Sequence, residues 1–262
     1  MKILFVGDIV GRPGREAIMS IIPRLKDELN IEFVIANAEN VAGGSGITPR
    51  LCSQLLAAGV DVLTSGDHIW RRQEVLDIIA IEPRLLRPLN LKPDVPGRGW
   101  NIFKKDNNKI AVVNLQGRVF MEPIECPFVY IKDALEEIKK ETNLIIVDMH
   151  AEATSEKIAL SWFLEGKVTL VAGTHTHVQT ADEKILGEHT AYITDVGMTG
   201  PMDSVIGRRK DKVLEMFVTG MPTRFEVATS DVRLQAVLVE ADPDSGRARS
   251  IERIEKKLLR ED

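Results

Sequence analysis

Eight side chains that can bind metal ions follow short apolar runs of this sequence, close to where each run ends. They are Asp8, Glu39, Asn40, Asp67, His68, His150, His175 and His177. Four of the chain's five histidines belong to this set, and only His189 lies elsewhere. A single histidine is more often a surface or core residue, but four beside carboxylates indicate a shared site. Imidazole nitrogens with carboxylate oxygens are donors that zinc, manganese and iron accept.

The number of candidate ligands predicts two metal ions rather than one. A single ion takes three or four protein ligands, whereas eight candidates are present. Two ions that share a carboxylate account for the surplus, and an extended His175-Thr176-His177 segment would aim both imidazoles at one cluster. Two ions about 4 Å apart suit displacement at phosphorus or hydrolysis of amides. Both enzyme classes stay open, as does a regulatory protein that binds a metal or nucleotide without turnover.

Glycine-rich segments lie beside two of these positions. The spacing of Gly7, Gly11 and Gly14 does not match the dinucleotide fingerprint, and no P-loop is present. Gly43 and Gly44 come directly after the Glu39-Asn40 pair. The backbone N–H groups of Gly11, Gly43 and Gly44 could approach a substrate phosphate, and tight turns are the alternative explanation.

The apolar runs alternate with amphipathic segments along most of the chain. The predicted strands are Lys2–Val6, Glu32–Ala36, Asp61–Thr64, Leu85–Leu89, Lys109–Leu115, Asn143–Val147, Lys167–Val171 and Ala191–Thr194. The predicted helices are Arg15–Leu29, Pro49–Ala58, Arg71–Ala80, Ile131–Lys140 and Glu156–Leu164. Strands apolar on both faces are typical of a parallel sheet covered by helices. The pattern predicts an α/β fold in which the eight candidates gather at the carboxyl ends of the strands.

The last third of the chain has a different pattern. Val232–Glu240 alternates apolar and polar residues, which predicts a half-exposed antiparallel strand, and Ile251–Leu259 is expected to form a short helix. Nearer the middle of the chain, Leu91–Gly99 is rich in proline and glycine and is expected to be irregular. We expect a homo-oligomer, because the 232–240 strand and this irregular segment could each meet a neighbouring subunit.

Composition narrows the class of protein. The chain has 262 residues, a formal net charge of −5 and two cysteines without a C-x-x-C pair. It contains no run approaching the roughly 20 apolar residues of a membrane span, and its mild acidity argues against a stable nucleic-acid partner. The unpaired cysteines favour a reducing compartment. We therefore expect a cytoplasmic protein without a membrane partner.

The order of these motifs resembles that of the calcineurin-like metallophosphoesterases. The resemblance rests on Gly7-Asp8, Glu39-Asn40, Gly66-Asp67-His68, His150 and the segment from Gly173 to His177. The opening GDIVGRPGR, the ENVAGG segment and DVGMTGPMDSVIG, which begins at Asp195, are similar to the YmdB-like subfamily of bacterial cyclic-nucleotide phosphodiesterases. The similarity covers essentially the whole chain.

This resemblance implies a fold, a reaction and a set of ligands. The fold would be one metallophosphoesterase domain over residues 1–262, layered α/β/β/α, with mostly parallel strands. The reaction would be hydrolysis of 2′,3′-cyclic nucleotides with two transition-metal ions, iron or manganese. One ion would be held by Asp8, Glu39 and His177, and the other by Glu39, Asp67, His150 and His175. Asn40 would be a ligand or an immediate neighbour of the bridging Glu39.

The resemblance implies a specific role for two residues of the Gly66-Asp67-His68 motif. His68 would stand outside the ligand set and protonate the departing ribose oxygen. Asp67 occupies a position where the subfamily usually has asparagine, so this chain adds one negative charge to the cluster. The extra charge is expected to hold the metals more tightly, whereas an Asp67 turned away from the site would have no such effect.

Overall fold

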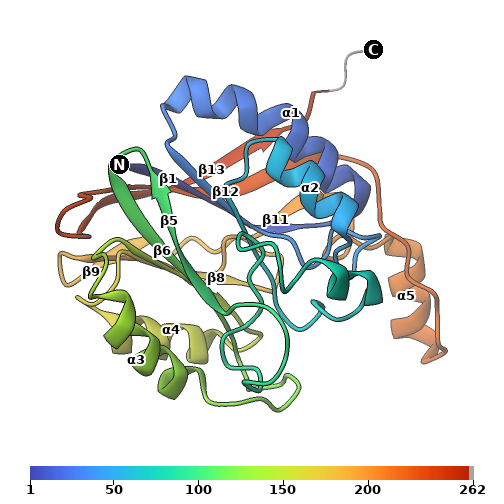
Figure 1. Ribbon diagram of the computed structural model, residues 1–262. Coiled ribbons are helices and arrows are strands. Elements are labelled where there is room, and N and C mark those ends of the chain that lie inside the picture. The colour runs from blue at the N-terminus through green and yellow to red at the C-terminus, as the bar shows by residue number, and fades with distance from the viewer. Residues whose placement is uncertain (260–262) are drawn as a thin grey trace.

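Two β-sheets stacked face to face form the centre of the molecule (Figure 1). The structure, a computed structural model, describes residues 1–259. The first sheet has the order β2 (Asp8–Ile9), β11 (Met198–Pro201), β12 (Val232–Ala241), β1 (Lys2–Val6), β3 (Phe33–Asn37) and β4 (Val62–Thr64), with β13 (Ala248–Lys257) paired to β12. The second has the order β5 (Trp100–Lys105), β6 (Asn108–Gln116), β7 (Ile145–His150), β8 (Leu170–Thr174), β10 (Thr190–Ile193) and β9 (Lys184–Leu186).

The strands that carry the site pair in parallel. In the first sheet β1, β3 and β4 are parallel neighbours, and in the second β6, β7, β8 and β10 are parallel neighbours. Antiparallel pairs lie around them, such as β1 with β12 and β5 with β6. Because parallel strands end on the same side, the site-bearing ends of each sheet share one edge.

Helices cover the outer face of each sheet, which gives four layers (Figure 1). The helices α1 (Gly11–Leu29) and α2 (Pro49–Ala57) lie over the first sheet, and α3 (Pro127–Ile138) and α4 (Thr154–Leu164) lie over the second. Strand alternation divides the core: Leu4 and Val6 belong to the cluster beneath α1, whereas Ile3 and Phe5 belong to the cluster between the sheets. The α/β/β/α layering predicted for the chain is confirmed.

Two predicted elements are not regular in the structure. Leu85–Leu89 makes only isolated bridges, Leu63 with Leu85 and Leu86 with Arg98, because Pro88 has no N–H with which to continue a ladder. Arg71–Ala80 is reduced to a single 3₁₀ turn, Gln73–Asp77.

No helix within residues 1–259 combines the length and apolarity that a membrane crossing requires.

The helix predicted over Ile251–Leu259 is wrong, because residues 251–257 belong to strand β13 and the last two residues have no regular structure. Ile251 and Ile254 have a helix-like spacing, but in a strand residues three apart face opposite sides. Ile251 packs against the cluster between the sheets, and Ile254 against the cluster beneath α1. β13 therefore packs apolar side chains on both of its faces, and the spacing of these residues alone could not distinguish a helix from a strand.

Strand β12 is antiparallel as predicted, but it is not half-exposed. It lies between β1 and β13, and its side chains alternate between two apolar clusters, Leu234 on one side and Val237 on the other. A buried strand cannot meet a neighbouring subunit. This part of the argument for a homo-oligomer therefore fails, while the irregular segment 91–99 is largely exposed.

Candidate metal centre

The predicted ligands meet where the carboxyl ends of the two sheets lie side by side. Asp8 begins β2, Glu39 and Asn40 follow β3, Asp67 and His68 follow β4, His150 ends β7, and His175 and His177 follow β8. The first sheet thus supplies the carboxylates, the amide and His68, and the second sheet supplies the other three histidines. The centre forms only where both sheets are stacked.

Four residues form a compact half of this centre. One ligand atom from each of Glu39, Asp67, His150 and His175 lies within 4.8 Å of the others. His150 Nε2 is 3.3 Å from Glu39 Oε1, 3.2 Å from Asp67 Oδ1 and 3.0 Å from His175 Nδ1. Asp67 therefore points into the cluster, and the interpretation in which it turns away does not describe the structure.

Each of the three clustered histidines is held through one ring nitrogen, which leaves the other facing the centre. His150 Nδ1 donates to Thr174 Oγ1 at 2.9 Å, because this hydroxyl donates its own proton to Asp148. His177 Nδ1 donates to Ile206 O at 3.0 Å. His175 Nε2 lies 3.3 Å from the carboxylate of Glu152. This arrangement fixes the tautomer of a metal-binding histidine and aims its lone pair.

Asp8, Asn40 and His177 form a more open half of the centre. Asp8 Oδ1 is buried and has no hydrogen-bond partner in the described part of the chain, and His177 Nε2 lies 3.9 Å from it. His177 Nε2 is also 3.2 Å from Asn40 Nδ2, whose amide group lies 3.2 Å from Glu39 Oε1. A buried carboxylate oxygen without a partner is costly, and a cation between Asp8 and His177 would satisfy it. The donors present in both halves fit divalent metal ions.

The backbone at His175 and His177 is not extended, which corrects that expectation. Both residues have a positive φ, 101° and 64°, in the left-handed region that residues other than glycine seldom adopt. Between them, Thr176 turns away and donates to Asp195 through both its amide and its hydroxyl. The two imidazoles still reach the same centre, His175 in the compact half and His177 in the open half.

Asp195 and Lys157 form a buried ion pair that sequence analysis missed. Lys157 Nζ is 2.7 Å from Asp195 Oδ2, with side-chain exposures of 0% and 1%. The same carboxylate also accepts hydrogen bonds from Gly197 N and Thr176, and so anchors the loop that carries His175 and His177. A lysine in an amphipathic helix gives no sequence signal of this role.

Burial and neighbouring charges shift the ionisation of the cluster. Burial raises the pKa of Asp8. Burial would also raise that of Glu39, but His150 and His68 outweigh it and hold the pKa well below its usual range. Burial, and then the neighbouring His150, lower the pKa of His175 to about 4. Glu39 is therefore ionised and His175 neutral at pH 7, which are the forms that bind metals. Burial lowers the pKa of His150, but the surrounding carboxylates outweigh it and raise the pKa, so a metal ion bound there would have to displace its proton.

His68 lies beside the cluster and lines the cavity that opens onto it. Its Nδ1 is 2.8 Å from Asn40 Oδ1 and 3.3 Å from Glu39 Oε1, and its side chain is 27% exposed. Burial lowers the pKa of His68, but Glu39 and Asp67 more than compensate and the net pKa is raised. A partly exposed imidazole that holds its proton near neutral pH can act as a general acid.

A cavity of about 340 Å³ lies over the centre and is lined by residues of both halves. Its lining includes residues that sequence analysis did not place there, namely Val10, Glu152, Thr176 and Ile206. Among residues 1–259, Arg208 is the one lysine or arginine in this lining, and its guanidinium donates to Gly43 O and Gly44 O. The run Arg208-Arg209-Lys210 was a weak signal of this role, because such runs are usually solvated. A cavity with one guanidinium beside metal ligands suits an anionic substrate.

The predicted glycines lie around this cavity in different ways. Gly44 is part of the lining and has a φ of 89°, and a Cβ there would overlap the Arg208 guanidinium. Gly43 offers its carbonyl to the same side chain, but it is outside the lining. The amide of Gly11 donates to Asn40 O at 2.9 Å, so this N–H is already used to hold the ligand loop. Gly66 also matters, since a Cβ there would overlap His150 and Glu39.

Comparisons with known sequences give a consistent result. A family model described as YmdB-like protein matches residues 4–254. A Bacillus subtilis 2′,3′-cyclic-nucleotide 2′-phosphodiesterase is 44% identical over 254 residues, which covers 97% of this chain and 96% of the relative. A Mycoplasma genitalium protein named as a putative phosphatase/phosphodiesterase is 37% identical, covering 97% of this chain and 92% of its own.

Solved structures show the same fold. A hypothetical protein from Thermus thermophilus has a TM-score of 0.93 and 38% identity, covering 98% of this chain and 99% of its own. A phosphatase from Mycoplasma pneumoniae has a TM-score of 0.92 and 36% identity, covering 98% and 93%. A putative 5′-nucleotidase from Staphylococcus aureus, with a TM-score of 0.59 and 14% identity, covers 97% of this chain and 54% of its own, and shares the fold alone.

Proposed function

We propose that this chain, which belongs to the YmdB-like protein family, is a metal-dependent phosphodiesterase that acts on 2′,3′-cyclic nucleotides. The relative from Bacillus subtilis that carries this activity in its name matches nearly the full length of both chains. In this chain the clustered carboxylates and histidines lie beside a cavity that contains one guanidinium. A small phosphodiester anion fits this combination of charge and size.

The ligand set is proposed from the two halves of the centre. Glu39, Asp67, His150 and His175 would hold one ion, and Asp8, Glu39 and His177 the other, with Glu39 shared and Asn40 beside it. Iron or manganese fits these ligands. Two such ions would lower the pKa of a bound water to near neutrality and neutralise charge on the phosphate oxygens.

His68 is the proposed proton donor to the ribose oxygen that leaves phosphorus. Its Nδ1 is close to Asn40 Oδ1, which keeps the imidazole oriented beside the cavity. A proton supplied to the leaving oxygen prevents an alkoxide from accumulating. Such assistance contributes roughly 100- to 10,000-fold in rate.

Arg208 is the proposed contact for the substrate phosphate. Burial lowers the pKa of its guanidinium, which is nevertheless charged at neutral pH because arginine titrates so high. Two of its N–H groups are fixed on Gly43 O and Gly44 O, so the planar group is held at the cavity wall. A fixed guanidinium binds a phosphate with little loss of side-chain entropy.

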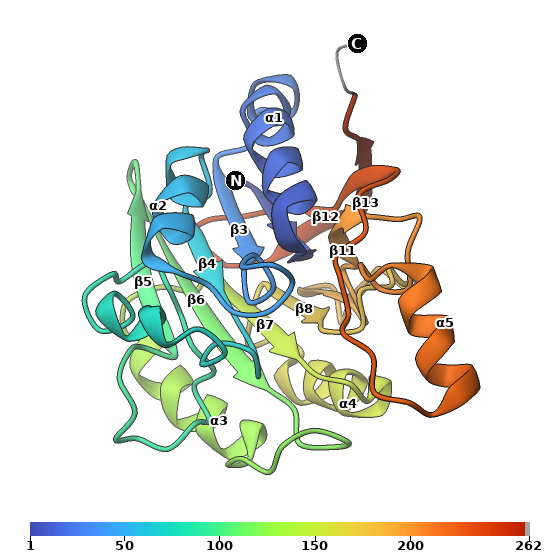
Figure 2. The ribbon, with the colours of Figure 1, turned by 90° about the vertical axis from the view of Figure 1, so that its right-hand side faces the viewer.

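We also propose a cytoplasmic location and a homo-oligomeric state. Both cysteines, Cys52 and Cys126, are free, as expected in a reducing compartment. Exposed apolar side chains on and after α5 (Lys210–Thr219), including Phe217, Val218 and Met221, support association between subunits. This helix projects from the body of the molecule (Figure 2). Light scattering that shows only monomer at assay concentrations would contradict the oligomer.

The observation that carries the proposal is the orientation of three histidines toward one set of carboxylates, each held by its second nitrogen. The test is hydrolysis of bis-p-nitrophenyl phosphate and of a peptide amide, each with added manganese or iron. Turnover of the diester alone, lost on chelation, supports the proposal. Turnover of the amide would instead indicate a two-metal amidase, and metal binding without turnover would indicate a sensor.

A further inference from the structure

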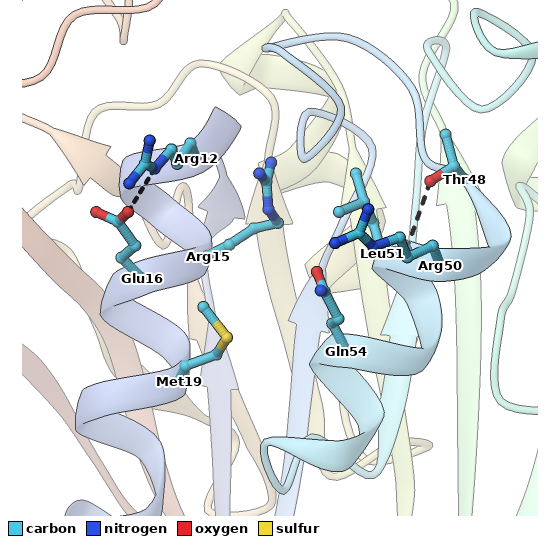
Figure 3. A pocket seen from close by; sticks show the side chains of 8 residues that line it. All are labelled: Arg12, Arg15, Glu16, Met19, Thr48, Arg50, Leu51 and Gln54. Carbon is cyan, nitrogen blue, oxygen red and sulfur yellow. Dashed lines mark hydrogen bonds and ion pairs between the residues drawn. The ribbon is translucent and has the colours of Figure 1, made fainter.

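A second cavity lies between α1 and α2, outside the metal centre. Its volume is about 420 Å³, and its lining residues come from the two helices and the residue before α2 (Figure 3). They are Arg12, Arg15, Glu16, Met19, Thr48, Arg50, Leu51 and Gln54. None of these residues lines the cavity over the metal centre. We call this cavity the α1–α2 groove.

Positive charge dominates the α1–α2 groove, although the whole chain is acidic. Three arginines face one carboxylate, Glu16, which is taken by Arg12 at 2.6 Å. Arg15 reaches from α1 toward α2, and Arg50 reaches from α2 toward α1 (Figure 3). Within residues 1–259, Arg50 forms no hydrogen bond or ion pair, and its charge acts unfavourably on Arg15. Within the described residues, neither Arg15 nor Arg50 forms an ion pair with a carboxylate, so the groove retains two uncompensated positive charges.

The remaining lining is suited to the organic part of a ligand. Met19 is 45% exposed and Leu51 is half-buried, and Gln54 offers an amide with no hydrogen bond to the described part of the chain. Thr48 caps α2 by accepting from Leu51 N, so the start of that helix is fixed. Cavities of several hundred cubic ångströms with a few polar groups are typical of small-molecule sites.

We propose that the α1–α2 groove binds a phosphate monoester, with its dianion between Arg15 and Arg50 and its organic part over Met19 and Leu51. Two guanidinium groups match a phosphate dianion in charge and can each donate two parallel hydrogen bonds to its oxygens. The proposal is independent of the reaction at the metal centre. It commits to phosphate recognition, with a nucleoside monophosphate and free phosphate as the two possible sources.

The groove is also connected to the ligand loop. Arg15 donates through its guanidinium to Val41 O, two residues after Glu39. Gly11, at the start of the same helix, donates to Asn40 O. A phosphate on Arg15 therefore lies one side chain away from the backbone that positions Glu39 and Asn40. A ligand in the groove could therefore influence the metal centre through this loop.

The test is calorimetric titration of the metal-loaded protein with adenosine 5′-monophosphate, inorganic phosphate and adenosine. Arg50→Glu is the test variant, and Arg24→Glu, the same charge change on α1 outside the groove, is the control. Arg50 is exposed in the first turn of α2, where a carboxylate favours the helix, so the variant should fold normally. Thermal unfolding verifies this.

Wild type and Arg24→Glu should both bind the monophosphate. Arg50→Glu should bind it at least about tenfold more weakly than wild type. Diester hydrolysis should stay within about twofold in both variants. Monophosphate binding tighter than phosphate binding identifies a nucleotide as the ligand, and equal binding identifies free phosphate. Binding unaffected by Arg50→Glu, or adenosine binding as tightly as its monophosphate, would overturn the proposal.

Discussion

The two halves of the metal centre differ in how completely the protein assembles them. In the compact half, four ligand atoms lie within 4.8 Å of one another and come from both sheets. In the open half, Asp8 and His177 remain 3.9 Å apart and one oxygen of Asp8 has no partner. Residues of both halves line the cavity, Glu39 and His175 from the compact half and Asn40 and His177 from the open half, so the halves differ in preassembly rather than in access. This contrast predicts one tightly held ion and one that is exchanged more easily beside the substrate.

The largest effect is expected from Glu39→Gln, because Glu39 is the proposed ligand of both ions. The change keeps the shape of the side chain but removes the shared negative charge. Metal analysis should show that both ions are lost, and turnover of the cyclic nucleotide should fall about 10,000-fold or more. Glu137→Gln, the same change at an exposed position of α3, is the matched control and should keep both ions. If Glu39→Gln retains two ions, Glu39 is not a ligand shared by both of them.

Replacing one histidine from each half tests the contrast directly. His177→Ala should leave about one ion per chain, held by the intact compact half. His175→Ala should reduce metal content further under a mild chelator, because it weakens the half that holds its ion tightly. Turnover should fall at least about 1,000-fold in both variants. Equal metal loss in the two variants would show that the halves do not differ.

A smaller effect is expected from His68→Ala, which removes the proton donor and no ligand. Turnover should fall between about 100- and 10,000-fold while both ions remain. A substrate with a good leaving group, such as bis-p-nitrophenyl phosphate, should lose less, because p-nitrophenolate needs no proton. If metal content falls together with activity, His68 is a ligand and the assignment is wrong.

The smallest effect is expected from Asp67→Asn, which restores the residue usual in the subfamily. Burial would raise the pKa of Asp67, but hydrogen bonding to His150 outweighs it and the pKa is lowered, so the carboxylate is charged. Loss of that charge should weaken metal retention under chelator about tenfold. It should also make the bound water more acidic, moving the acid limb of the pH–rate profile to lower pH. An unmoved limb with unchanged metal affinity would place Asp67 outside the ligand set.

The sequence predicted the compact half better than its surroundings, for a physical reason. Polar residues at the ends of buried strands are constrained by sheet topology, so Glu39 and His150 could be placed together from the sequence alone. The backbone at His175 and His177 could not, because its positive φ depends on Asp195, Lys157 and Thr176 closing around the loop. Tertiary pairing likewise decided β13, where the spacing of Ile251 and Ile254 is compatible with helix or strand.

The same limit applies to the two cavities. Arg208 and Arg50 look alike in the sequence, because each is an arginine within two residues of a helix start. Only the fold shows that Arg208 is fixed on Gly43 O and Gly44 O over the metal centre, while Arg50 faces Arg15 across another groove. The long-range contacts that create a cavity have no local pattern in the chain.

The most direct test of the account is metal content measured together with hydrolysis of 2′,3′-cyclic AMP on one anaerobic preparation. The account predicts about two iron or manganese ions per chain. On graded chelation, one ion should leave before the other, turnover should stop as the first leaves, and manganese or iron should restore it. Turnover that continues after both ions are removed, or its absence with both ions bound, would contradict the account.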